Sequence, residues 1–222
     1  MKITITILLF LNSFLIFSQE KINQINAKGE RVGIWKKYYA NNRIRYQGQF
    51  ENGKEIGVFK YFSIENSKQP IVIKTFSSNN HKANVKFYNK EAILESDGTM
   101  NGKLRIGKWN FYQPDGISLL SVENYINGIL EGEVLTYYSN GKITEILHYK
   151  SGKLNGVVKQ FSKIGSVLNH VNYVDGKLNG LAQYYDENGE LIYKGNYKDD
   201  VKVGKWEHYK NGKQVKKDKL RQ

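Results

Sequence analysis

The sequence predicts an all-β protein: one elongated ribbon of about eight consecutive β-hairpin units, each about 24 residues long. Three observations support this class. A segment of nearly constant length repeats along the chain, an aromatic residue recurs at a fixed place in each repeat, and Asn-Gly or Asp-Gly pairs separate the extended segments. No window shows the 3.6-residue period of an amphipathic helix, so the segments between the turns are predicted to be strands.

The repeat is clearest where "SGKLNG" at 151–156 returns as "DGKLNG" at 175–180. We call the last glycine of each such segment the anchor of its unit. Successive anchors lie 24 or 25 residues apart, except for one interval of 50 that holds a divergent unit with Ala83 at the anchor position. The seven anchor glycines are Gly33, Gly57, Gly107, Gly132, Gly156, Gly180 and Gly204.

Two positions after the anchor keep their character in every unit. The second residue after the anchor is apolar: Trp35, Phe59, Val85, Trp109, Val134, Val158, Ala182 and Trp206. The fifth residue after the anchor is aromatic: Tyr38, Phe62, Tyr88, Tyr112, Tyr137, Phe161, Tyr185 and Tyr209. Because these positions differ by three, a regular strand places them on opposite faces. Either both faces carry apolar side chains, or a β-bulge near the glycine brings both positions to one face.

Two tight turns divide each unit. The turn inside the hairpin is Asp-Gly at 115–116 and Asn-Gly at 140–141, 188–189 and 211–212, pairs in which both central residues are expected to take positive φ. The turn that leads into the next unit is Asn-Gly, Ser-Gly or Asp-Gly at 52–53, 101–102, 127–128, 151–152 and 175–176. We expect the anchor glycine to let an aromatic ring of the adjacent strand lie against its backbone.

Residues 137–156 carry Tyr-Tyr-x-Asn-Gly, then Tyr-x-x-Gly-Lys, then Leu-x-Gly, and residues 184–204 carry a variant that begins Tyr-Tyr-x-x-Asn-Gly. This pattern resembles the MORN-repeat variant family of bacterial proteins. The likeness covers about residues 28–213, although the second unit has a longer loop with Pro70 and the third lacks its glycine. The resemblance implies consecutive β-hairpins that serve as a scaffold for contact with protein or lipid. Bacterial members are often labelled antitoxin components of toxin–antitoxin systems.

The first residues have the layout of a secretory signal peptide. Met1 and Lys2 are followed by an apolar run from Ile3 to Phe17 that is too short and interrupted for a membrane span, and cleavage is expected between Ser18 and Gln19. An uncleaved anchor is the alternative. The predicted parts are a signal peptide at 1–18, a short lead at 19–27, the repeat domain at 28–213 and a basic tail at 214–222. We therefore expect an exported protein, periplasmic or extracellular.

The charge of the chain favours an anionic partner. The formal net charge is +13, with the excess concentrated toward the end of the chain. Export argues against nucleic acid, which leaves an acidic protein, an anionic glycan or lipid headgroups. The other interpretation is a solvated charged end that only prevents aggregation.

Four lysines are the candidate partner-binding residues. Each follows the glycine of a turn between units, so the stacked units should line them up along one edge: Lys54, Lys103, Lys153 and Lys177. A row of this kind could attract an acidic partner. Alternatively, the lysines only keep the turns soluble and discourage edge pairing. Tyr39, Tyr138 and Tyr184 could form a second contact surface, or they could serve the internal stacking of the ribbon.

The sequence predicts no catalytic, metal or cofactor site. The histidines, at 81, 148, 170 and 208, do not form the closely spaced pairs of a metal site, and the absence of cysteine excludes a thiol nucleophile. The spacing G-x-x-x-x-G-K at 102–108 resembles a phosphate-binding loop. However, Trp109 follows the lysine where Ser or Thr should hold Mg²⁺, and strands flank the segment. The spacing therefore comes from two glycines of the repeat.

Three functions remain open at this point. The first is a non-catalytic, exported repeat scaffold that binds a protein or an anionic cell-envelope surface. The second is an antitoxin- or immunity-like protein that neutralises a partner toxin. The third is an envelope hydrolase. It has the least support, because a ribbon offers no deep pocket in which carboxylate pKa values could shift.

Overall fold

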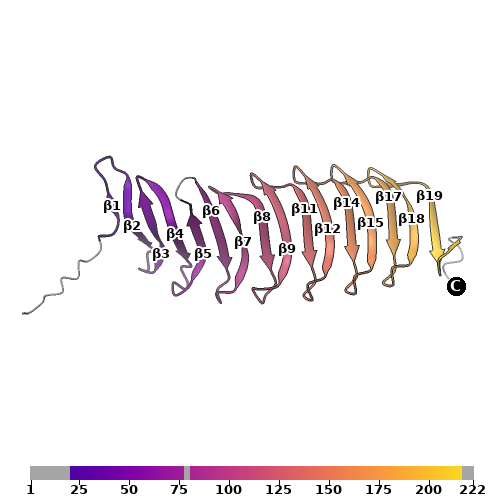
Figure 1. Ribbon diagram of the computed structural model, residues 1–222, viewed down its shortest axis with the longest axis horizontal. Helices are drawn as coiled ribbons and strands as arrows, with labels where there is room; N and C mark the ends of the chain where they lie inside the picture. The colour runs from indigo at the N-terminus through magenta and orange to yellow at the C-terminus, as the bar shows by residue number, and fades with distance from the viewer. Residues whose placement is uncertain (1–20, 78–80, 217–222) are drawn as a thin grey trace, which may run out of the picture.

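The computed structural model describes residues 21–77 and 81–216, and these form one antiparallel sheet of 20 strands. No helix occurs among the described residues. The strands follow one another in chain order from one end of a long ribbon to the other (Figure 1). This confirms the predicted all-β class and the ribbon of hairpins.

The strands of the first four units lie between residues 24 and 126. They are β1 (Gln24–Ile25), β2 (Arg31–Tyr38), β3 (Ile44–Glu51), β4 (Lys54–Phe62), β5 (Pro70–Phe76), β6 (Lys82–Tyr88), β7 (Leu94–Asn101), β8 (Leu104–Tyr112) and β9 (Leu119–Ile126). Each unit has a first strand that contains the anchor and a second strand after the hairpin turn. The longer loop of the second unit lies between β4 and β5, and Pro70, the first residue of β5, pairs with Phe62.

The strands of the last four units lie between residues 129 and 215. They are β10 (Ile129–Leu130), β11 (Gly132–Tyr137), β12 (Ile143–Lys150), β13 (Lys153–Leu154), β14 (Gly156–Phe161), β15 (Val167–Val174), β16 (Lys177–Leu178), β17 (Gly180–Tyr185), β18 (Leu191–Lys198), β19 (Val201–Lys210) and β20 (Lys213–Val215). In units five to seven the first strand is split just before the anchor. In units two, four and eight it is continuous.

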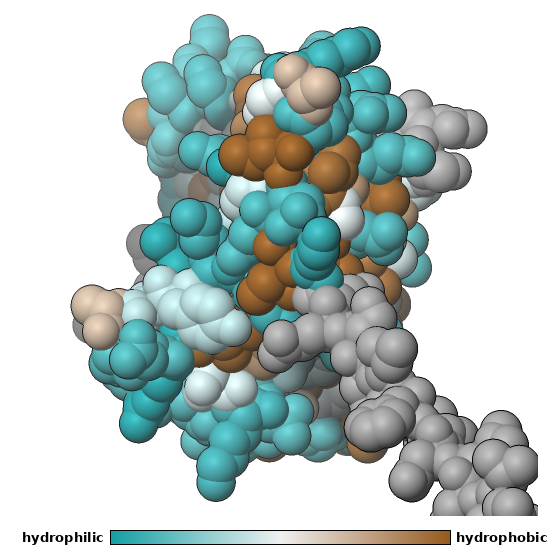
Figure 2. Space-filling model, turned by 90° about the vertical axis from the view of Figure 1, so that its left-hand side faces the viewer, coloured by the Kyte–Doolittle hydropathy of each residue, from teal (hydrophilic) through white to brown (hydrophobic). Residues whose placement is uncertain are grey.

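The core is a line of side chains from the second position after each anchor. Trp109 and Phe59 are 0 % exposed and Val85 is 1 % exposed, and the line continues through Val134, Val158 and Ala182. Viewed from the N-terminal end, hydrophobic residues gather in a central band with hydrophilic residues on both sides (Figure 2). Trp206, in the last unit, is the only member of this line that is not buried.

The second and fifth residues after the anchor lie on opposite faces of the first strand. In unit one, Lys37 pairs with Tyr46 and Tyr38 pairs with Ile44, so the extra residue belongs to the second strand and the first strand stays regular. A similar shift occurs in the first seven units. A bulge also occurs at Gly107, but it precedes the second residue after the anchor and does not change this outcome.

The expectation that an aromatic ring lies against the anchor glycine is wrong. A Cβ built at Gly33, Gly57 or Gly107 would meet no atom within 4 Å. All seven anchor glycines instead have positive φ, which an L-residue adopts only with strain. Where Ala83 replaces the glycine, β6 pairs with β5 in unbroken register and no bulge forms.

Aromatic rings do lie on glycines, but on those of the preceding second strand. A Cβ at Gly98 would come within 2.4 Å of the Trp109 ring, and a Cβ at Gly195 within 2.2 Å of the Trp206 ring. Gly48 has the same relation to Phe59, at 2.3 Å. The rings therefore occupy the space that a side chain would fill.

We call the position that these glycines occupy the floor position. It lies in the second strand of a unit, eleven residues before the apolar residue that stands two positions after the next anchor. From unit one to unit seven its occupants are Gly48, Lys74, Gly98, Glu123, Leu147, Val171 and Gly195. A floor glycine always precedes Phe or Trp, and any other floor residue precedes Val or Ala. A large core ring in one unit is thus matched by a floor glycine in the preceding unit, and a small core residue is matched by a larger floor residue, as close packing requires.

The two kinds of turn differ in backbone conformation. Between units, both central residues have positive φ at 52–53, 127–128, 151–152 and 175–176, whereas at 101–102 only Gly102 does. Within hairpins, only the second residue does at 115–116, 140–141 and 188–189, whereas both do at 211–212. The expectation of two positive φ values is therefore wrong for the hairpin turns at 115–116, 140–141 and 188–189, and it holds at 211–212.

Candidate functional site

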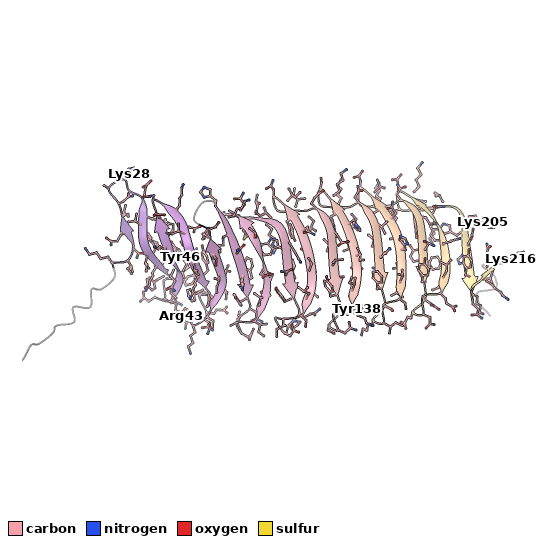
Figure 3. All side chains as sticks on the ribbon, in the orientation of Figure 1. Lys28, Arg43, Tyr46, Tyr138, Lys205 and Lys216 are labelled. Atoms are coloured by element: carbon pink, nitrogen blue, oxygen red, sulfur yellow. The ribbon has the colours of Figure 1, made fainter. Side chains whose placement is uncertain are left out.

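The four candidate lysines lie along one long edge of the ribbon. Because the strands alternate in direction, every turn between units falls on the same edge, which is the upper edge in Figure 3, where Lys28 and Lys205 also lie. All four lysine side chains are exposed: Lys54, Lys103, Lys153 and Lys177. None of them forms an ion pair with another described residue.

Backbone hydrogen bonds connect each of these turns to the preceding one. The N–H of Gly152 donates to the carbonyl of Leu130 at 2.9 Å, and the N–H of Gly176 donates to that of Leu154 at 2.8 Å. Acidic side chains add to this bracing, because Glu131 accepts from the N–H of Ser151 at 2.7 Å. The lysines therefore project from turns of fixed spacing.

The tyrosines considered as a contact surface serve the ribbon itself. The hydroxyl groups of Tyr39 and Tyr138 donate to the carbonyls of Phe62 and Phe161, each at 2.8 Å, and so join one hairpin turn to the next. Tyr184 stacks on Tyr193 with ring centroids 4.4 Å apart. Tyr138 marks the lower edge of the ribbon in Figure 3.

Cationic side chains cover all three tryptophans of the chain. The guanidinium carbon of Arg105 lies 4.7 Å from the ring centroid of Trp109, and Arg31 lies 4.9 Å from that of Trp35. In the last unit, Nζ of Lys202 lies 4.2 Å from the Trp206 ring. Each cation is two residues before its anchor, where units five to seven have leucine.

Arg105 also belongs to a polar network. It donates to the hydroxyl of Tyr125 at 3.2 Å, and that hydroxyl donates to Glu123. Burial, followed by the bond to Glu123, raises the pKa of the Tyr125 phenol. A phenol held protonated in this way is a fixed hydrogen-bond donor, which suits a structural role between neighbouring strands.

Two histidines line one hollow of about 440 Å³ on the sheet face of units five and six, with Glu133 and Lys159 beside them. Nδ1 of His148 lies 2.7 Å from the carbonyl oxygen of Val157, and Nε2 lies 3.9 Å from Glu133. Burial and the nearby Lys159 lower the pKa of His170. Within residues 21–77 and 81–216, no three His, Asp or Glu residues are grouped to hold a metal ion.

A second hollow, of about 780 Å³, lies at the C-terminal end. Its wall is formed by the rings of Tyr193, Trp206 and His208, and its rim includes Lys202, Lys205 and Lys216. Sequence analysis missed this site. The available signal was the last unit, where no aromatic residue follows Tyr209.

The predicted signal peptide at 1–18 and residues 217–222 of the predicted basic tail lie outside the described residues. In the part of the chain that is described, no helix is long and apolar enough to cross a membrane.

A family model described as "MORN repeat variant" matches the chain at residues 31–52, 130–151 and 178–199. These segments fall in units one, five and seven, and each joins anchor-side strand, turn and second strand in the order that the structure shows. A comparison with curated proteins finds no match.

Proposed function

Because the chain carries MORN-variant repeats, which are commonly non-catalytic repeat scaffolds, we propose that it is an exported scaffold that binds an acidic protein or an anionic cell-envelope surface. The observation that carries this proposal is the row of exposed lysines on braced turns. A rigid row of like charges raises the local concentration of an anionic partner and steers its approach.

The remaining geometry is consistent with this role. The net charge of +13 provides a long-range field of the required sign. The hollows in the described residues lie along one sheet or at its end. The carboxylates of Glu123 and Glu207 accept hydrogen bonds from tyrosine hydroxyl groups. Binding over an extended surface fits a ribbon better than enclosure of a small molecule does.

The test measures how much full-length chain is retained on isolated envelope from its own cell. Retention should be strong at low salt and lost near 1 M salt, where the screening length falls to about 3 Å. Changing Lys54, Lys103, Lys153 and Lys177 together to Glu should abolish retention. The matched control changes Lys36, Lys60, Lys86 and Lys159 to Glu, the same charge difference on the sheet face.

Two results would redirect the proposal. Equal loss in both charge-reversed variants would show that net charge alone drives retention and that the row has no special role. A one-to-one complex with a single protein that survives high salt would favour the antitoxin- or immunity-like alternative. Circular dichroism of both variants checks that the β-structure is kept.

A further inference from the structure

In the last unit, the described part of the second strand is short. In unit four, β8 pairs with β9 from Gly107 to Tyr112, so Trp109 is enclosed on both sides. In unit eight, β20 pairs with β19 only at His208, Tyr209 and Lys210. Among the described residues, nothing pairs with the outer edge of β19 from Val201 to Glu207.

The hollow beside this edge is the space where a second strand lies in the other units. Trp206 forms its wall and remains partly exposed, whereas Trp109 is 0 % exposed. Nε1 of Trp109 donates to the carbonyl of Thr99 at 3.1 Å. Nε1 of Trp206 is buried without a hydrogen-bond partner, a state that costs free energy, although the acceptor for Trp109 belongs to the preceding strand β7 and not to β9.

The chain itself shows which strand fits this edge. Residues 105–109 read Arg-Ile-Gly-Lys-Trp, and residues 202–206 read Lys-Val-Gly-Lys-Trp. In unit four the complementary strand places Tyr125 opposite the anchor glycine and Glu123 opposite the tryptophan. The cation two residues before the anchor then contacts the tyrosine, since Arg105 lies 5.5 Å from the Tyr125 ring.

Charge selects among the possible occupants. The hollow is lined by three lysines and one carboxylate, so an acidic strand is favoured: Lys202, Lys205, Lys216 and Glu207. The residues after Lys216 include no aromatic residue that could stand opposite Gly204. A second copy would bring β2, whose Arg31, Lys36 and Lys37 have the same sign of charge and whose upper part already pairs with β1.

We propose that the outer edge of β19 takes up an extended acidic segment of a partner protein by β-strand addition. The segment carries an aromatic residue opposite Gly204 and a carboxylate two residues before it, opposite Trp206. Main-chain hydrogen bonds supply affinity, and the alternate side chains over the hollow supply specificity. This site is separate from the lysine row and does not depend on it.

The test uses a fluorescently labelled octapeptide with the sequence of residues 119–126, Leu-Leu-Ser-Val-Glu-Asn-Tyr-Ile, and fluorescence anisotropy with the full-length chain. Trp206→Ala should weaken binding roughly thirtyfold, as expected for a central aromatic contact. Lys205→Glu should weaken it roughly tenfold, and Lys54→Glu, an equal charge change in the lysine row, should leave it unchanged. A peptide with alanine in place of its tyrosine should bind as weakly as the Trp206 variant.

Several outcomes would overturn the proposal. These are no binding of the peptide, binding that is equal in the Trp206→Ala and Lys54→Glu variants, or binding that appears only after residues 217–222 are removed, which would assign the edge to the chain's own end. Self-association in sedimentation experiments that the peptide does not reverse would assign the edge to a second copy. Salt-dependent retention on the envelope is measured separately, so either idea can fail alone.

Discussion

Units one, four and eight differ from units five, six and seven in how they fill the same repeat. Around the anchor the first group reads Arg-Val-Gly-Ile-Trp, Arg-Ile-Gly-Lys-Trp and Lys-Val-Gly-Lys-Trp. The second group reads Leu-Glu-Gly-Glu-Val, Leu-Asn-Gly-Val-Val and Leu-Asn-Gly-Leu-Ala. We call them cation-capped and leucine-capped units. In the first group, the second residue after the anchor is a large ring that lies under a cation. In the second group, the same position holds a small aliphatic residue, and leucine replaces the cation.

The backbone changes together with the side chains. The anchor φ is 69°, 64° and 67° in the cation-capped units, but 85°, 116° and 91° in the leucine-capped units. In the leucine-capped units, Glu131, Asn155 or Asn179 precedes the anchor and the first strand is split there. Across these six units, cap, anchor φ and core residue change together, whereas unit two combines a core ring and a floor glycine with Glu55 at the cap position.

The largest effect is expected from breaking the pair of core and floor residues. Trp109→Val should lower the free energy of unfolding by about 3–5 kcal/mol, because it leaves a void above Gly98. Adding Gly98→Val should restore about 2 kcal/mol by filling that void. Chemical denaturation measures the total change in the free energy of unfolding. Hydrogen exchange of β7 to β9 shows which strands are destabilised, since units of a repeat protein can open separately.

The matched control for this pair is Gly98→Val alone. It should destabilise the protein by about 1–3 kcal/mol, because the new side chain overlaps the Trp109 ring. If the free-energy changes of the two single variants add up to that of the double variant, the two positions are not coupled and the comparison fails at its central point.

The second effect concerns the anchor backbone. Gly156→Asn should destabilise the protein by about 1–3 kcal/mol, because φ is 116° there and a Cβ would lie 3.2 Å from that of His148. Gly107→Asn should be tolerated at less than about 1 kcal/mol, because φ is 64° and no atom lies within 4 Å of the added Cβ. Thermal unfolding of the two variants gives the difference. Equal losses would show that the two anchors are equivalent.

The third effect concerns the cation. Arg105→Gln should cost about 1 kcal/mol, since it removes the charge above the Trp109 ring. Arg105→Lys should cost less, because Lys202 fulfils the same role over Trp206 at 4.2 Å. Both are measured by denaturant unfolding. A glutamine variant as stable as the lysine variant would show that packing of the side-chain stem matters, and not its charge.

The smallest effect is a pH dependence confined to the leucine-capped units. The pKa of His170 is lowered from its ordinary value of 6.5. The unfolded chain therefore binds the proton more readily, and the free energy of unfolding should fall as pH decreases through about 6.5. His170→Gln should reduce this fall. Hydrogen exchange at pH 5 and pH 8 should show the change near β15 and not near β2 to β4.

The repeat and its strands could be predicted because their signals are local. Turn glycines require positive φ, and the aromatic residue five positions after each anchor marks the same point in every hairpin. The register shifts left no such mark, since an unpaired residue such as Arg45 has no characteristic chemistry. Sequence reasoning therefore left open which faces the second and fifth residues occupy.

The glycine beneath each ring was assigned to the wrong position for a related reason. The anchor is glycine in nearly every unit, so the contact with a ring was predicted there. Gly48, Gly98 and Gly195, in contrast, occur only before a large ring. Their partner lies across the unit boundary, eleven residues later, so the relation appears only when neighbouring units are compared. The C-terminal hollow was missed because it lies beside the part of β19, from Val201 to Glu207, with which no strand beyond β18 pairs among the described residues, and the shared repeat pattern does not show where pairing stops.

The floor position also defines where this ribbon can grow or shrink during evolution. A deletion of residues 171–194 would leave Gly195 in front of Trp206, and the new junction would still fit. A deletion of the same length shifted by one residue, 172–195, would leave Val171 in front of Trp206 and force a side chain into the ring. The inheritable module therefore does not run from turn to turn. It begins at a floor residue and ends just before the next one, so that each ring is inherited together with the glycine that admits it.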